Sequence, residues 1–186
     1  MNSKLFDVKN NGLFKYSKKV PSSLHNLFHI SFKGHLEGIW VPKRPDGDYD
    51  EDNVTGNLPE TTEARISLSP TIEQCFQAVF ANVKSFYKKG NTDKLEFYVY
   101  APEFKGNERI VFPKELSKNK LVHDAHITEE HCLITPVYMK KVGKVSIKLP
   151  DPKNNVDYYA YDIKTKEGYY GYLPGKIEVT KLEGNF

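Results

Sequence analysis

Three segments of the chain carry side chains of types that can take part in catalysis or ligand binding. His29 lies within an alternating apolar segment, and Ser67 and Ser69 end a second segment of this kind. Glu130 stands directly before a third. A histidine titrates near neutral pH, and a carboxylate stabilises positive charge that develops on a sugar. We therefore treat His29, Ser67, Ser69 and Glu130 as candidate site residues.

The three segments read Phe-His-Ile-Ser, then Ala-Arg-Ile-Ser-Leu-Ser-Pro, then Asp-Ala-His-Ile-Thr-Glu-Glu. This pattern resembles the ADP-ribosyltransferase fold, and it is similar to small uncharacterised proteins of bacteriophages and prophages. In that family the early His contacts the nicotinamide mononucleotide half of NAD, and the serine-bearing strand shapes the pocket. The late Glu holds the ribose as nicotinamide leaves. The resemblance implies NAD or a related nucleotide as the cofactor, with His29 and Glu130 as catalytic residues and Ser67 and Ser69 as cofactor-binding residues.

Two arginines and a helix start could contribute to binding of the phosphates. Arg44 and Arg65 can pair with phosphate oxygens, since a guanidinium offers two parallel donors. The backbone amides from Thr71 to Glu73 open an expected helix and point at any anion placed there. We therefore include Arg44 and Arg65 among the cofactor-binding residues.

A non-enzymatic function is the first alternative. Leu68 and Thr128 stand where members of the family have a threonine and a glutamate, so several expected catalytic partners are missing. A phage counter-defence protein could use the same residues to bind a host protein or to sequester a nucleotide signal. The partner in either case is a nucleotide ligand or a host protein.

A phosphoesterase is the second alternative. The triplets His29-Ile30-Ser31 and His126-Ile127-Thr128 resemble the paired motifs of 2H phosphoesterases, in which two histidines act as acid and base. This hypothesis requires His29 and His126 to face one groove. A third cluster, from His123 to His131, contains metal-ligand residue types, but the strong zinc motif His-Glu-x-x-His is missing, and no metal is expected.

The segment from Arg65 to Lys89 predicts a strand, a tight turn and the main helix. Ser69 fits an N-cap and Pro70 fits the first helical position. Apolar residues then recur at helical spacing and predict a helix from Pro70 to Tyr87. They are Ile72, Cys75, Phe76, Val79, Phe80, Val83 and Phe86.

Strands outnumber helices elsewhere, so we expect an α+β fold with a mixed or mostly antiparallel sheet around one helix. The core domain spans residues 24–149, after a mobile N-terminal arm of residues 1–23. A tyrosine-rich β-meander appendage follows in residues 150–186. Further strands are expected at Leu95–Tyr100 (stopped by Pro102), Glu108–Phe112, His131–Pro136 and, after a turn near Gly143, Lys144–Leu149.

The composition indicates where in the cell the protein is located, but it does not indicate its function. The 186 residues are 39% hydrophobic and 13% aromatic, which is typical of a folded domain, and the net charge of +3 is small. The first residues contain no apolar signal segment, and no apolar run reaches the roughly 20 residues of a membrane span. Cys75 and Cys132 are expected to be buried thiols. These features predict a cytoplasmic protein that does not contact membranes, and they leave nucleic-acid binding open.

Overall fold

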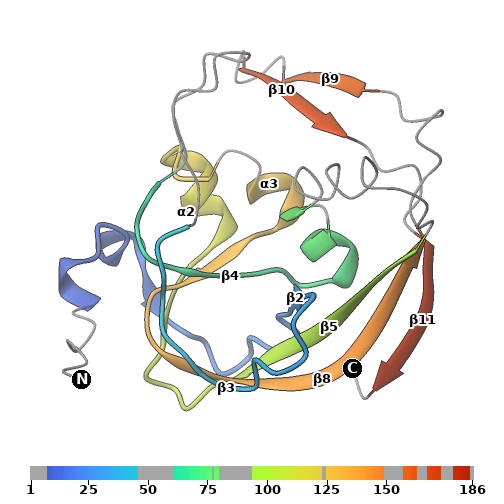
Figure 1. Cartoon of the computed structure of the whole chain (residues 1–186). Helices are drawn as coiled ribbons and strands as arrows, with labels where there is room; N and C mark the ends of the chain where they lie inside the picture. The colour runs from blue at the N-terminus through green and yellow to red at the C-terminus, as the bar shows by residue number, and fades with distance from the viewer. Residues whose placement is uncertain are drawn as a thin grey trace.

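The computed structural model describes residues 8–45, 61–76, 78–79, 94–122, 125–148, 157–162, 167–172 and 178–184. This part of the chain is mostly β, and all of its strand pairs are antiparallel (Figure 1). Of the mixed or mostly antiparallel sheet that the sequence predicted, the antiparallel arrangement is confirmed, while the α+β class gives way to a mostly β fold. A fold around one main helix is not confirmed, because the described residues contain no long helix. Helical conformation is confirmed at residues 72–76 and 78–79, and the rest of the expected helix from Pro70 to Tyr87 lies outside the described residues.

The larger sheet is built on two long strands that pair along their lengths. Both strands curve strongly (Figure 1), and shorter strands pair with their outer edges. The long strands are β5 (Lys94–Glu103) and β8 (Val137–Lys148); β2 (His29–Ser31) pairs with β5, while β3 (Gly38–Trp40) and β11 (Glu178–Gly184) pair with β8. As a result β2 and β3 lie on opposite sides of the β5–β8 pair.

A smaller sheet crosses the open side of this curved sheet. Its order is β1 (Lys18–Lys19), β6 (Arg109–Val111), β7 (His131–Leu133) and β4 (Ile66–Leu68). One edge of β4 pairs with β7. On the opposite edge, the residue after β4 and the residue before it each form a single β-bridge with a residue next to a strand of the larger sheet. These bridges are Phe28 with Ser69, beside β2, and Lys43 with Arg65, beyond β3. β4 therefore connects both sides of the half-barrel formed by the larger sheet.

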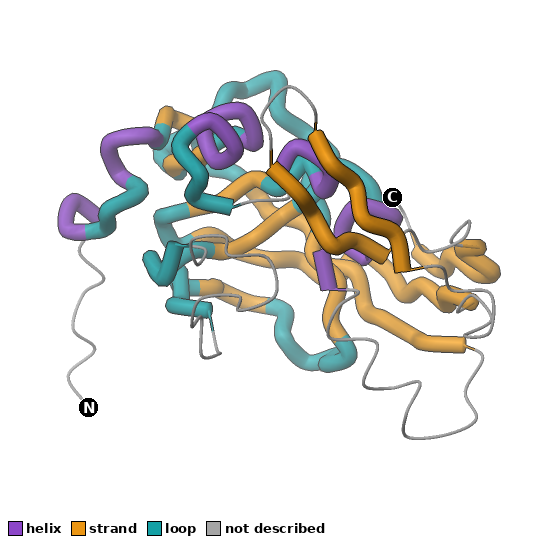
Figure 2. The backbone as a smooth tube through the Cα atoms, turned by 90° about the horizontal axis from the view of Figure 1, so that it is seen from above, coloured by secondary structure: helices purple, strands orange, loops and turns teal. Residues whose placement is uncertain are grey.

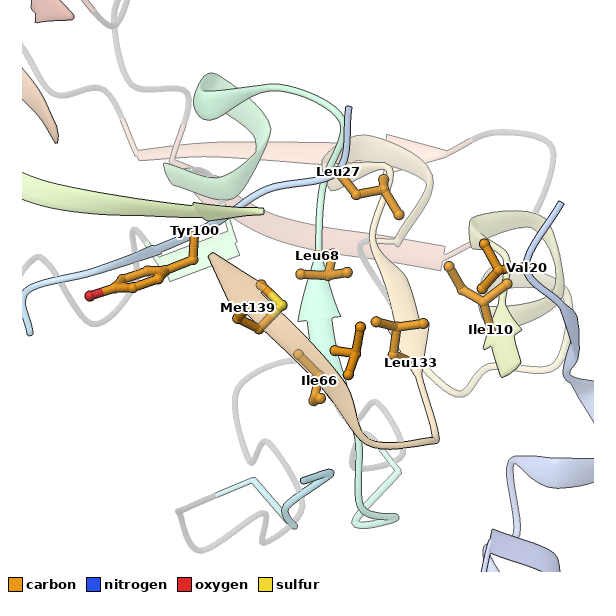
Figure 3. Packing of buried hydrophobic residues seen from close by; sticks show 9 residues of the cluster. Val20, Leu27, Ile66, Leu68, Tyr100, Ile110, Leu133 and Met139 are labelled. Carbon is orange, nitrogen blue, oxygen red and sulfur yellow. The ribbon is translucent and has the colours of Figure 1, made fainter. Parts of the chain in front are cut away.

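The core between the two sheets is apolar, and it explains why apolar and polar residues alternate along β4. Ile66 and Leu68 are 5% and 1% exposed, and they pack in one cluster with Leu133 and Met139 (Figure 3). Because successive side chains of a strand point to opposite faces, Ser67 lies on the other face of β4. Burial of each large aliphatic side chain stabilises the fold by about 1.5–3 kcal/mol.

Short helices flank the sheets (Figure 2). They are η1 (Val8–Asn10), η2 (Phe14–Tyr16), α2 (Pro113–Lys118) and α3 (Ala125–Thr128). Within the expected N-terminal arm, Leu13 is fully buried and β1 pairs with β6, and the mobility of the arm stays a prediction. No helix in the described ranges is long and apolar enough to cross a membrane.

Two local predictions on β5 and β8 were wrong. Gly143 lies inside β8, where the pairing shifts register by one residue opposite Val99 and Tyr100. A glycine between two apolar segments is typical both of a turn and of a bulge within one continuous strand. The sequence alone therefore did not distinguish the bulge at Gly143 from a turn. Pro102 does not end β5, which continues to Glu103 beyond the segment that pairs with β2. A proline is tolerated there because β5 has only β8 as a partner at that point.

The helix after β4 begins later than the sequence predicted. The hydroxyl of Thr71 accepts the backbone N–H of Gln74 at 3.2 Å, so Thr71 is the N-cap and Pro70 precedes it. Ser69 instead exchanges two backbone hydrogen bonds with Phe28. The serine predicted to cap the helix thus belongs to the bridge between the two sheets.

The predicted β-meander of the tail would pair its three strands one after another. In the structure only the first two of them pair with each other, and the third pairs with the larger sheet. β9 (Asp157–Asp162) pairs with β10 (Glu167–Tyr172), and β11 pairs with β8 of the larger sheet. The division of the chain at residue 150 stays a prediction.

Candidate functional site

All of the predicted site residues except Arg44 lie on or beside β4. Ile66 and Leu68 point into the core. Because successive side chains of a strand point to opposite faces, the residues before, between and after these two point to the face away from the core. These side chains are Arg65, Ser67 and Ser69, and Glu130 joins them through Arg65. We call His29, Arg65, Ser67, Ser69 and Glu130 the β4 cluster.

His29 reaches β4 through its side chain. Arg65 and Ser69 both make backbone bonds across the free edge of β4, so alternation directs the carbonyl of Ser67 to that same edge. The Nδ1 atom of His29 lies 3.0 Å from this carbonyl oxygen. Because a carbonyl only accepts, Nδ1 carries the proton in this hydrogen bond. The imidazole therefore fills the interval between the two backbone bridges.

The electrostatic environment of His29 favours the neutral ring. Desolvation lowers the pKa of His29, while the hydrogen bond to the Ser67 carbonyl and the negative charge of Glu130 act in the opposite direction. A neutral ring with its proton on Nδ1 has a lone pair on Nε2. Nε2 can accept a hydrogen bond from a ligand hydroxyl, and His29 is only partly buried.

Glu130 is a buried carboxylate with a buried cationic partner. It is 6% exposed, and its Oε1 lies 3.7 Å from Nε of Arg65, which is 9% exposed. The thiol of Cys132 donates to the same oxygen at 3.4 Å. Arg65 also donates to the carbonyl of Thr61. The guanidinium that the sequence assigned to a phosphate is thus directed at Glu130, and its phosphate role stays a prediction.

Ser69 lies at the buried end of the cluster, next to Cys75. Ser69 is 3% exposed, and the Cys75 thiol lies 3.1 Å from the carbonyl of Phe28 and 3.9 Å from that of Ser69. Burial raises the pKa of Cys75 to about 12, so this sulfur stays a thiol at neutral pH and is a poor nucleophile. Cys75 and Cys132 are both buried thiols that form no disulfide, as the sequence predicted.

Other candidate residues lie apart from the cluster. Arg44 is exposed beyond β3, and within the described residues no ion pair connects it to Glu130. His126 is exposed on α3, so the second triplet of the phosphoesterase hypothesis is helical whereas the first lies in β2. His123 and Asp124 lie outside the described residues. In the described ranges no three His, Cys, Asp or Glu side chains come close enough to bind a metal ion.

Sequence reasoning missed an aromatic pair beside His29. The ring centroid of Trp40 lies 4.9 Å from that of His29 in an edge-to-face arrangement, and 5.5 Å from that of Tyr100. The register between β2 and β5 places Tyr100 directly opposite His29. Trp40 comes from β3, which pairs with neither strand, so no spacing in the sequence indicates the contact.

Comparisons with known proteins do not assign the chain to a family. No protein-family model, no curated protein and no solved structure matches the chain.

Proposed function

We propose that the protein binds NAD or a related nucleotide at the β4 cluster, in the manner of an ADP-ribosyltransferase-like protein of phage or prophage type. One observation carries the proposal: the Nδ1 of His29 bonds the carbonyl of Ser67, 38 residues away, while the charge of Glu130 acts on the same ring. The segments of Ser67 and Glu130, both distant from His29 in sequence, therefore act on one imidazole ring, which supports the proposal.

The chemistry of the cluster suits a ribosyl group. Nε2 of a neutral His29 accepts from a hydroxyl, and the half-buried Ser67 hydroxyl can both donate and accept on the face of β4 away from the core. A carboxylate such as Glu130 stabilises positive charge on the ribose as the glycosidic bond breaks. In hydrolysis the bonding electrons leave with nicotinamide, a water oxygen bonds to the ribose carbon, and that water releases a proton.

The test combines binding and turnover. NAD is titrated calorimetrically into the wild-type protein and the Glu130→Gln variant, and released nicotinamide is measured by chromatography. The account predicts saturable binding by the wild type and nicotinamide release that falls at least about a hundredfold in Glu130→Gln, the scale of losing one electrostatic contact to a transition state. Equal turnover by both proteins would remove the catalytic role of Glu130.

Glu129→Gln is the matched control, because Glu129 is the exposed neighbour of Glu130. This variant should bind and turn over NAD like the wild type. Thermal unfolding of all three proteins separates a loss of function from a loss of folding. If none of them binds NAD, the proposal is wrong.

A non-enzymatic nucleotide binder is the second candidate, and the Arg65–Glu130 pair favours it. A carboxylate that is 6% exposed and already paired is less free to contact a reacting ribose. Such a protein would sequester a nucleotide signal without consuming it. Quantitative recovery of intact ligand after binding would support this candidate, and free nicotinamide would contradict it.

A further inference from the structure

Trp40 and His29 meet at a place where no strand pairing holds them together. β2 pairs with β5, and β3 pairs with β8 on the far side of the same sheet. The two side chains approach across the free edge of β4, between the two backbone bridges. Their edge-to-face contact at 4.9 Å is therefore a contact of side chains alone.

The Trp40 ring is itself fixed from two directions. Its Nε1 donates to the carbonyl of Leu36 at 2.6 Å, and its ring rests against Tyr100. The hydroxyl of Tyr100 donates to the carbonyl of Lys33 at 2.6 Å and accepts from the backbone N–H of Leu36 at 3.3 Å. The loop between β2 and β3 thus orients both aromatic rings toward His29.

We propose that Trp40 is a positioning residue that holds the His29 imidazole neutral, with its proton on Nδ1 and its Nε2 lone pair available to a ligand. This inference rests on the proposed function only for the identity of the ligand. Trp40 covers part of the ring and excludes water from it, while the Ser67 carbonyl selects the nitrogen that carries the proton. A neutral, single tautomer accepts a hydroxyl donor at Nε2 and rejects an acceptor there.

Glu130 is a charged group whose field acts on His29, and it opposes the effect of Trp40. Its negative charge raises the pKa of His29, whereas desolvation lowers it and is the larger effect. From β5, Tyr100 presents its ring to the site while its hydroxyl is engaged with the loop. Removing the aromatic cover should therefore let Glu130 dominate and favour the protonated ring.

The chain contains a matched control for this contact. Phe112 meets the ring of His131 edge-to-face, with centroids 5.5 Å apart. Nδ1 of His131 lies 2.8 Å from a backbone carbonyl, that of Glu129, and desolvation also lowers the pKa of His131. Phe112→Ala should therefore affect His131 as Trp40→Ala affects His29.

The experiment follows both histidines by NMR, through the pH titration of their Cε1–H resonances, without any nucleotide. His29→Phe and His131→Phe assign the two signals. In Trp40→Ala the His29 midpoint should rise to or above the ordinary value of about 6.5, while the His131 midpoint stays in place. Phe112→Ala should give the reverse pattern. Trp40→Phe, which keeps a ring in a smaller volume, should move the His29 midpoint only part of the way.

A second readout uses the wild-type protein, in which Trp40 is the only tryptophan. Its fluorescence should titrate with the His29 midpoint, and this titration should vanish in His29→Phe. If the His29 midpoint in Trp40→Phe and Trp40→Ala equals that of the wild type, the proposal is wrong and Trp40 is only structural. Shifted midpoints in a protein that binds no NAD would leave this inference standing and remove the proposed function.

Discussion

Two histidines on either side of β4 share one local arrangement. His29 lies at the free edge of β4, and His131 lies on β7 opposite Leu68 at the paired edge. Each directs Nδ1 at a backbone carbonyl, each meets an aromatic ring edge-to-face, and desolvation lowers the pKa of each. Glu130 raises both pKa values through its charge.

The two histidines differ in what their hydrogen bonds connect. His131 bonds the carbonyl of Glu129, two residues earlier, and so supports a local turn. His29 bonds Ser67, 38 residues away, and joins the larger sheet to β4. His131 is 6% exposed, whereas His29 is more open to solvent. We propose that this arrangement is structural at His131, where it is local and buried, and available to a ligand at His29, where it joins two elements at a partly open edge.

The largest expected effect on the free energy of unfolding comes from breaking the ion pair between Arg65 and Glu130. Arg65→Met leaves Glu130 buried without its cation, which should lower the free energy of unfolding by about 3–5 kcal/mol. Arg65→Met combined with Glu130→Met should recover much of this loss, because no charge then remains buried. Chemical denaturation of the two variants measures both values, and a loss below about 1 kcal/mol in Arg65→Met would contradict the pairing.

Replacing each histidine by phenylalanine tests the comparison itself. Each replacement keeps a ring and removes a hydrogen bond. His29→Phe should cost about 1–3 kcal/mol, because the carbonyl of Ser67 loses a partner between two sheets. His131→Phe should cost about 0.5–1.5 kcal/mol, since Glu129 is exposed and water can replace the donor at its carbonyl. Urea unfolding of both variants should show this order, and the reverse order would contradict it.

The pH dependence of stability should follow from the lowered pKa values of His29 and His131. The unfolded chain binds protons more readily than the folded chain at these positions. Their contribution is therefore fully present above the ordinary value of about 6.5 and is lost as pH falls through 6.5 toward the folded values. The slope should reach at most about 1.4 kcal/mol per pH unit for each histidine. Urea unfolding across this range should give a shallower slope in each phenylalanine variant, and an unchanged slope in both would exclude this origin.

The smallest expected effect concerns the turn beside His131. Glu129 has a φ of 49°, a left-handed conformation that is strained for any residue with a Cβ atom. Glu129→Gly should raise the free energy of unfolding by up to about 1 kcal/mol, the relief of strain being partly offset by the entropy of glycine. Glu129→Ala keeps the strain and removes the charge, so its thermal midpoint should stay below that of Glu129→Gly. Equal midpoints would show that strain is not released.

Local patterns in the sequence predicted the strands around the site. Alternation around His29 and Ser67 gave β2 and β4, and the apolar segment after Glu130 gave β7. Periodicity of this kind reports burial of one face, which is set within a few residues. The cap at Thr71 was missed because Ser69 and Pro70 offered an equally good local signal, and the pairing of Ser69 with Phe28 decided between them.

The short helices and the contacts within the site were harder to predict. α2 begins at Pro113 and buries Leu116, but six residues are too few to show helical periodicity. The sequence identified His29, Ser67 and Glu130 as a group only through a resemblance. It gave no indication of the Arg65–Glu130 pair or of Trp40 beside His29, because both depend on how β4 meets the larger sheet.

The most direct test of the account is a titration of NAD into the labelled protein, followed through the Cε1–H resonances of His29 and His131. If His29 is the ligand contact and His131 its structural counterpart, the His29 resonance should shift saturably while the His131 resonance moves much less. A shift of His131 without His29, or no shift of either resonance, would contradict the assignment of the nucleotide site to the β4 cluster.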